Sequence, residues 1–279
     1  YIKPNIVLAS DDDAQEYVMS HYKNREDIQI VFVGVNAKAE QYGYQNANNV
    51  TGVLERIPYE AVKNVVEIIA KQHHLTPPYR VLHISDQSII VGYDDLNMHE
   101  YPNWAPVQLL KSNLVSTFDE WKQAIRDSIK VADIILVSNY RKVYTDNHKN
   151  IFTPFKEVIE WSYKNTPLPL IGINGFVCKE GAALAVATSP IEQGEIGARI
   201  VLSLLESNIT AKEIPFQNSA FPMIYIDEKR FNASGFTLPQ LYVAFAKASN
   251  NFYQTAHSWE STDSQQKLEI NLQGKSQIK

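Results

Sequence analysis

Small polar side chains follow several apolar segments of this sequence, and they are its best candidates for chemistry. Hydroxyl, carboxylate and amide groups bind the polar parts of a small molecule through hydrogen bonds. Each could also serve only to cap a following helix, since Ser, Asp and Asn are preferred capping residues. Five segment ends of this type favour one shared polar cleft. The candidates are Ser10, Asp11, Asp12, Asn36, Ser85, Asp86, Ser138, Asn139 and Asn174.

No combination of residues predicts an enzyme. The single cysteine, Cys178, has no histidine near it in the sequence to form a reactive thiolate, and it excludes an internal disulfide. Phosphate-binding loops rich in glycine and the Gly-x-Ser-x-Gly nucleophile turn are both absent from the sequence. One acidic group matches no calcium-loop spacing and is interpreted as a solvated helix face: Asp94, Asp95, His99 and Glu100. We therefore expect no catalytic residue, no cofactor and no metal.

The composition is that of a globular protein and limits the possible partners. The 279 residues are 44% hydrophobic and 20% charged, with a net charge of −5. Basic residues are scattered rather than clustered, which argues against a nucleic-acid partner. No apolar run approaches the roughly 18–20 residues that span a bilayer. The sequence begins at Tyr1 rather than Met, so the lack of an export signal is no evidence against export.

Predicted strands and helices alternate along the chain and position these polar residues. Apolar runs predict strands at 6–9, 29–35, 49–53, 81–84, within 107–115, and at 133–137 and 168–173. Amphipathic helices are predicted after residues 10, 58, 116 and 153. Continuous apolar strands separated by such helices are typical of parallel sheets covered on both faces, so an α/β fold is expected. We expect the cleft to be bounded by residues 10–13, 36, 85–88, 138–140 and 174–176.

One stretch, residues 181–198 (GAALAVATSPIEQGEIGA), reads as an extended segment followed by a helix with Pro190 at its start. It resembles the segment that crosses between lobes in the ABC-transporter substrate-binding family of the tryptophan/tyrosine-uptake type. Residues 9–14, 31–36, 49–53, 221–227 and 234–239 agree with this family, and the resemblance covers about residues 4–245. It implies a type-I periplasmic-binding-protein fold, in which two Rossmann-like lobes joined by three crossings hold a small solute.

The resemblance also divides the chain. Lobe one would comprise residues 1–55 and 190–213, lobe two residues 56–189 and 214–253, and residues 254–279 would form a polar tail. With only two strong strands, the first lobe is predicted to be incomplete, lacking roughly 60–90 upstream residues. Glu192 and Gln193 would lie at a crossing and could reach the cleft.

The expected function is capture of a small polar or amino-acid-like ligand by hinge closure for an ABC importer. The expected partners are that ligand and either an ABC transporter permease or a fused signalling module, with no nucleic acid. The location would be periplasmic or otherwise extracytoplasmic, with or without a membrane anchor. The alternative is a ligand-sensing ectodomain of a histidine kinase or cyclase. A transcriptional regulator with this fold would need a helix-turn-helix segment, which the sequence does not contain.

Overall fold

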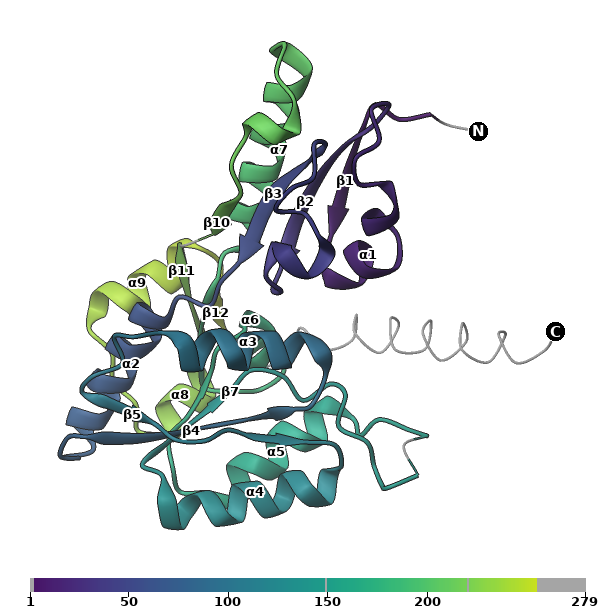
Figure 1. Ribbon diagram of the computed structural model, residues 1–279. Coiled ribbons are helices and arrows are strands. Elements are labelled where there is room, and N and C mark those ends of the chain that lie inside the picture. Colours follow the sequence, from purple (N-terminus) through teal and green to yellow (C-terminus); the bar gives the residue numbers. More distant parts are fainter. Residues whose placement is uncertain (1–2, 149, 220, 255–279) are drawn as a thin grey trace.

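Two β-sheets divide the molecule into two lobes, drawn one above the other in Figure 1. The computed structural model describes residues 3–148, 150–219 and 221–254. The first sheet has four parallel strands in the order β1-β2-β3-β10. They are β1 (Ile6–Ser10), β2 (Gln29–Val35), β3 (Val50–Glu55) and β10 (Gln217–Ser219). The second sheet has eight strands and is the larger, and the α/β fold class is confirmed.

The second sheet is mixed. Its order is β12-β11-β9-β8-β7-β4-β5, with β6 also paired to β4, and only β11 and β9 pair antiparallel. The strands are β4 (Tyr79–Asp86), β5 (Val107–Leu109), β6 (Asn113–Val115), β7 (Ile134–Val137), β8 (Leu170–Gly172), β9 (Leu184–Thr188), β11 (Pro222–Asp227) and β12 (Phe252–Tyr253).

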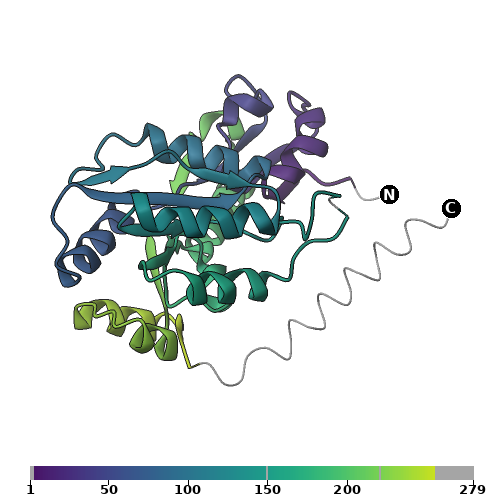
Figure 2. The ribbon, with the colours of Figure 1, turned by 90° about the horizontal axis from the view of Figure 1, so that it is seen from below.

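Helices cover both faces of the second sheet. In the view from below, α4 (Phe118–Val131) and α5 (Phe155–Asn165) lie on the near face (Figure 2). The opposite face is covered by α2 (Tyr59–Gln72), α3 (Ile89–Glu100) and α9 (Gln240–Ala248). The shorter α6 (Gly175–Lys179) and α8 (Glu228–Ala233) complete this lobe.

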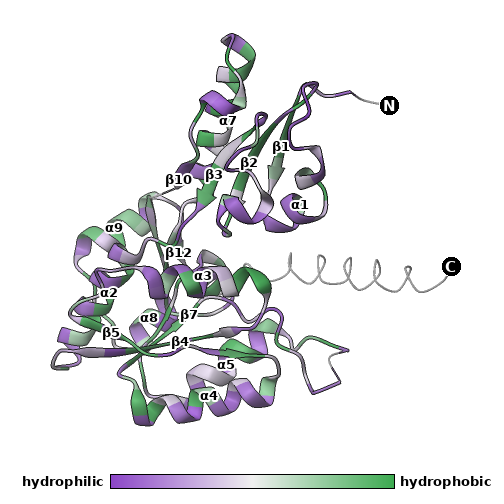
Figure 3. Ribbon diagram, viewed as in Figure 1, coloured by the Kyte–Doolittle hydropathy of each residue, from purple (hydrophilic) through white to green (hydrophobic). Residues whose placement is uncertain are grey.

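The helices form where the sequence signals lie. Thr117 and Glu120 make a capping box at the start of α4, where a helix was predicted, and Trp121 and Ile125 lie on the buried face of this helix. In α2 the apolar residues at 3.6-residue spacing are all buried: Val62, Val65, Val66, Ile69 and Ala70. The hydrophobic strands of both sheets appear green in Figure 3, against the more hydrophilic outer face of α4.

The first lobe is built around α7 (Pro190–Glu206), which begins at the predicted Pro190 and packs on β2 and β3. A Cβ added at Gly197 would lie 2.6 Å from a Val33 methyl, so glycine permits this close approach. At Gly194, by contrast, an added Cβ would meet nothing within 4 Å, so this glycine is not needed for close packing. The opposite side of the sheet carries α1 (Asp12–Tyr17) and the short 3-10 helices Met19–Tyr22 and Ala39–Tyr42. A third 3-10 helix, Ala211–Glu213, precedes Ile214, which packs in the same apolar cluster as α7.

The chain passes between the sheets after β3, after β9 and between β10 and β11. The last passage differs from the predicted boundary, because β10 pairs in parallel with β3 and so belongs to the first sheet. The polar sequence Gln217–Ser219 gave no strand signal, since its pairing depends on a strand 160 residues earlier. Nearly all of the predicted polar tail lies outside the described residues. Within the described part of the chain, no helix combines the length and apolar character needed to cross a membrane.

Candidate functional site

A cavity of about 340 Å³ lies between the lobes, where the carboxyl ends of strands from both sheets converge. Loops at such ends are the usual ligand sites of open α/β sheets, because side chains and helix N-termini meet there. The cavity is lined by Asp11, Gly34, Asn36, Glu55, Ile90, Val91, Asp94, Asn139, Asn174, Gly175, Phe176, Lys179, Ala187, Thr188, Pro190, Gln193 and Tyr225.

Helix α3 of the second lobe lies beneath the first lobe and contacts it through polar groups (Figure 1). The Asn36 amide donates to Asp94 Oδ1 at 2.9 Å, and the Asn97 amide donates to the Asn36 carbonyl at 3.3 Å. Lys38 and Glu100 add an exposed ion pair at 2.9 Å. When the lobes separate, water can replace polar contacts of this kind, so separation costs less free energy than exposing an apolar interface would.

Three carboxyl groups line this cavity, those of Asp11, Glu55 and Asp94. Burial raises the pKa of Asp94, which is 4% exposed, to about 7, and the negative charges of Glu55 and Asp12 add to the effect. Burial also raises the pKa of Asp11, reinforced by Asp12 and Asp13 and opposed by the hydrogen bond from the Asp12 N–H. Glu55 accepts hydrogen bonds from Thr188 Oγ1 at 3.2 Å and from Gln193 Nε2 at 3.0 Å.

The backbone between β1 and α1 is strained where it borders the cavity. Asp11 has φ 73° and ψ 163°, a region that only glycine adopts readily, and its carboxylate accepts from the Asp12 N–H at 2.7 Å. Gly34, with φ 68°, faces it, and a Cβ there would lie 3.4 Å from Gln193 Oε1. Such strain costs about 1–3 kcal/mol and concentrates at functional sites.

Five of the predicted site residues are brought together in the cavity lining: Asp11, Asn36, Asn139, Asn174 and Gln193. The other six are not in that lining: Ser10, Asp12, Ser85, Asp86, Ser138 and Glu192. Ser10 is exposed, and the Glu192 carboxylate accepts from the Phe221 N–H at 2.9 Å. Among the 85–88 and 10–13 segments expected to bound the cleft, only Asp11 lines it.

Two predicted aspartates serve the backbone. Asp12 is buried and accepts from the N–H groups of Asn36 and Ala37, at 2.9 and 3.1 Å, and from the Tyr42 hydroxyl at 2.6 Å. Asp86 is fully buried and accepts from the N–H groups of Ser88 and Lys142, each at 3.0 Å. Both carboxylates thus hold loops in place, which is the capping role that the sequence left open.

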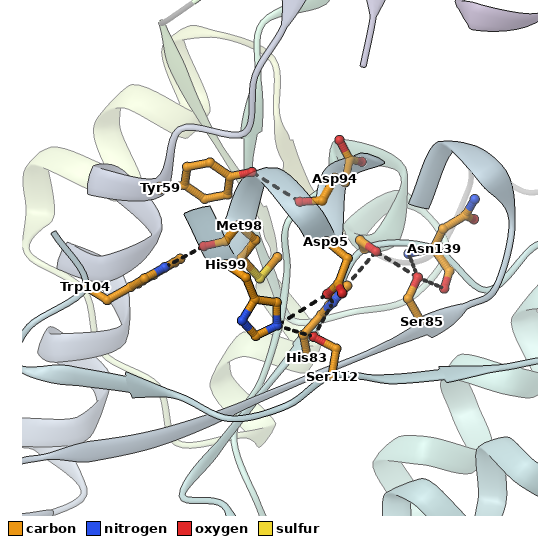
Figure 4. Close-up of polar contacts among 11 residues, drawn as sticks. Tyr59, His83, Ser85, Asp94, Asp95, Met98, His99, Trp104, Ser112 and Asn139 are labelled. Carbon is orange, nitrogen blue, oxygen red and sulfur yellow. Dashed lines mark hydrogen bonds and ion pairs between the residues drawn. The ribbon is translucent and has the colours of Figure 1, made fainter. Parts of the chain in front are cut away.

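Ser85 and Ser138 belong to a buried hydrogen-bond chain that the sequence did not reveal (Figure 4). His83 Nε2 lies 2.8 Å from Ser138 Oγ, and His83 Nδ1 lies 2.8 Å from Asp95 Oδ1. Burial raises the pKa of Asp95, but hydrogen bonds from His83 and Ser112 outweigh it and leave that pKa below its usual range. The spacing between these residues in the sequence gives no signal, since strands β4 and β7 bring them together.

Ser138, His83 and Asp95 are hydrogen-bonded in the order of a Ser-His-Asp triad, but the Ser138 hydroxyl cannot act as a nucleophile in this arrangement. Ser138 is fully buried, and its O–H donates to Ser85 Oγ at 2.7 Å. A nucleophile must reach the substrate, and this oxygen is enclosed by protein. The group is therefore interpreted as structural.

A second concavity of about 660 Å³ lies on the other side of α3, against β5 and β6. Its lining comes from the second lobe alone: Asp95, His99, Leu109, Lys111, Ser112 and Leu114. The smaller cavity is the better candidate site because both lobes contribute polar groups to it. Sequence reasoning missed Glu55, Asp94, Lys179 and Tyr225 there.

Comparison with solved structures gives the fold. A substrate binding protein with adhesive properties from Clostridium difficile, in its ligand-free, open form, has a TM-score of 0.64 and 15% identity over 91% of this chain and 79% of the other. A conserved domain protein from Vibrio cholerae has a TM-score of 0.60 and 15% identity over 87% and 77%. An ABC domain in complex with L-Trp from Streptococcus pneumonia has a TM-score of 0.59 and 13% identity over 86% and 79%.

These likenesses establish the class of structure. The chain has the two-lobed, Rossmann-like fold of periplasmic binding proteins, as its sequence predicted. No family model matches the sequence, and no curated protein matches it.

Proposed function

We propose that this protein binds a small polar or amino-acid-like solute between its lobes, outside the cytoplasm, for uptake by an ABC transporter, and that it is not an enzyme. The observation that carries the proposal is the cavity of about 340 Å³ lined from both lobes. Ligand pockets usually have volumes of roughly 300–1,000 Å³, and this cavity lies at the lower end of that range, which suits a small molecule.

Hinge closure would link binding to conformation. Asn36 and Glu55 come from the first sheet and Asn139 and Asn174 from the second, so only the closed form offers a solute all four groups. A ligand that contacts both lobes shifts the population toward that form. The structure of the Streptococcus pneumonia protein with L-Trp supports an amino-acid-like ligand by analogy of fold.

The experiment is equilibrium dialysis of the protein against a small-molecule extract of bacterial cells, with mass spectrometry of the retained compounds. We expect the wild-type protein to enrich at least one compound. Asn139→Ala and Gln193→Ala should each weaken its binding about tenfold or more, because a buried polar partner is lost. Glu195→Gln, an exposed carboxylate on α7, should bind like the wild type.

Small-angle scattering with the enriched compound should show a smaller radius of gyration than without it, as lobes close. If the protein enriches no compound, or if both cavity variants retain it fully, the proposed function is wrong.

A further inference from the structure

The cavity carries more negative than positive charge. Asp11, Glu55 and Asp94 line it, against Lys179 as the one basic residue of that lining. None of the three carboxyl groups forms an ion pair with any residue that the structure describes. Their hydrogen-bond donors are all neutral. Asp94 is buried, Glu55 is partly buried and Asp11 is exposed. A buried carboxylate is normally paired with a cation, and Asp94 has no such partner among the described residues.

Asp94 is the most informative of the three. Only Oδ1 has a hydrogen bond, from the Asn36 amide, and Oδ2 has no donor among the described residues. The side chain is 4% exposed and points away from the Asp95 network, on the other side of α3 (Figure 4). Because Asp94 lines the cavity, a carboxylate oxygen without a protein donor is suited to accept a hydrogen bond from a ligand there.

The guanidinium group of Arg56 interacts electrostatically with Asp94 but does not bind it. Arg56 acts on Asp94 only through space, and its guanidinium donates to the backbone carbonyls of Val35, Asn36, Ala37 and Glu55. The other charged or titratable groups facing Asp94 are Glu55 and Asp12, which repel it, and Tyr59, whose hydroxyl donates to the Asp94 backbone carbonyl. No cationic group of the described residues therefore donates to Asp94 Oδ2.

We infer that the solute taken up by this cavity is a small organic cation with at least one primary ammonium group, bound by Asp94 and Glu55; this inference rests on the proposed binding function. An ammonium group offers three donors to carboxylates on different sides. Phe176 and Tyr225 supply aromatic surface for the carbon skeleton, and Lys179 is placed to bind a carboxylate if the solute has one. An excess of acidic groups favours solutes with a net positive charge over zwitterions and sugars.

The test uses the compound that the dialysis experiment enriches. Its net charge at pH 7 should be positive, and Asp94→Asn and Glu55→Gln should each weaken its binding at least tenfold. Both variants keep the size of the side chain and remove its charge, although each replaces one acceptor oxygen by an NH2 donor. Glu195→Gln is the matched control, because it removes an exposed carboxylate from α7 and should leave affinity unchanged.

A second measurement detects whether Asp94 releases a proton when the solute binds. The pKa of Asp94 is about 7, so part of the unliganded protein is protonated there at neutral pH, and a bound cation should expel that proton. Calorimetric titration in two buffers with different ionisation enthalpies should show proton release by the wild type and none by Asp94→Asn. Affinity should also fall as pH is lowered from 8 to 6.

The outcomes separate this inference from the proposed function. An enriched compound that is a sugar, a zwitterion or an anion, and whose binding depends on Asn139 and Gln193, overturns the cation inference and leaves solute binding intact. A cation that binds equally well to Asp94→Asn and Glu55→Gln also overturns it. Enrichment of nothing overturns the proposed function itself.

Discussion

Polar groups lie on both sides of helix α3, and the two sides differ in how many of these groups have hydrogen-bond partners within the protein. On the side of the second sheet, His83 has a partner at each ring nitrogen, Asp95 and Ser138, and Ser138 in turn donates to Ser85. On the side of the cavity, Asp94 has one partner for two oxygens, and Glu55 has only neutral donors. Both sides are polar and buried, so burial alone does not distinguish them.

The difference teaches how to separate stability from binding. A network whose donors and acceptors are all used within the protein stabilises the fold, and it loses stability when one member is removed. A buried group with unused capacity costs stability and retains the ability to bind a solute. Asp94 and Asp95 are adjacent in the sequence, yet Asp95 belongs to the network that stabilises the fold and Asp94 retains capacity to bind a solute.

The largest effect is expected from Asp94→Asn as pH changes. The pKa of Asp94 is about 7 in the folded protein, against about 4 when unfolded, so its contribution to stability is fully present below pH 4 and is lost as pH rises through 7. Over that range the wild type should lose up to about 4 kcal/mol relative to the variant. Urea denaturation of both proteins at pH 4, 5.5, 7 and 8 measures this difference. A difference that stays constant over these pH values would show that Asp94 is an ordinary carboxylate.

A somewhat smaller loss is expected from His83→Ala. Removing the buried imidazole takes one hydrogen-bond partner from each of Asp95 and Ser138 and leaves a cavity, which should cost about 3 kcal/mol in free energy of unfolding. His99→Ala is the control, because His99 is exposed and lies 3.8 Å from the Asp95 carboxylate; it should cost less than about 1 kcal/mol. Denaturant titration of both variants measures the contrast, and equal losses would contradict the distinction between them.

Asp86→Ala should cost about 2 kcal/mol, because the N–H groups of Ser88 and Lys142 lose their acceptor. Solute affinity should hardly change, since Asp86 is outside the cavity lining. Thermal melts and calorimetric titration measure the two quantities on one sample. The reverse result, lost affinity with intact stability, would restore Asp86 to the binding role that the sequence predicted.

The smallest effect belongs to Ser10→Ala. Ser10 is exposed and outside the cavity lining, so the free energy of unfolding should change by less than about 0.5 kcal/mol. Affinity should equal that of the wild type by the same calorimetric titration. A clear loss of affinity would show that the first lobe reaches the solute through Ser10 as well as Asp11.

Sequence patterns sufficed for the fold and for part of the candidate site. Apolar runs and the Thr117–Glu120 capping box depend on contacts within a few residues, so strands and helices could be read directly. Asn36, Asn139 and Asn174 were found because each follows a buried strand of a parallel sheet. Glu55 is the last residue of β3, but Arg56 and Ile57 follow it, so no small polar residue marks this strand end in the sequence.

What the sequence determined by itself was therefore local: the alternation of elements, their caps and the strand ends at which polar groups collect. The tertiary structure decided which of those groups have unused hydrogen-bonding capacity in the cavity. From the sequence, Asp94 was interpreted as part of a solvated helix face, but the packing of α3 beneath the first lobe buries it. Asp86 and Ser138 were predicted to be cleft residues, but their side-chain oxygens form hydrogen bonds within the protein. Local periodicity places a side chain on an element, whereas its exposure and partners depend on segments tens of residues away.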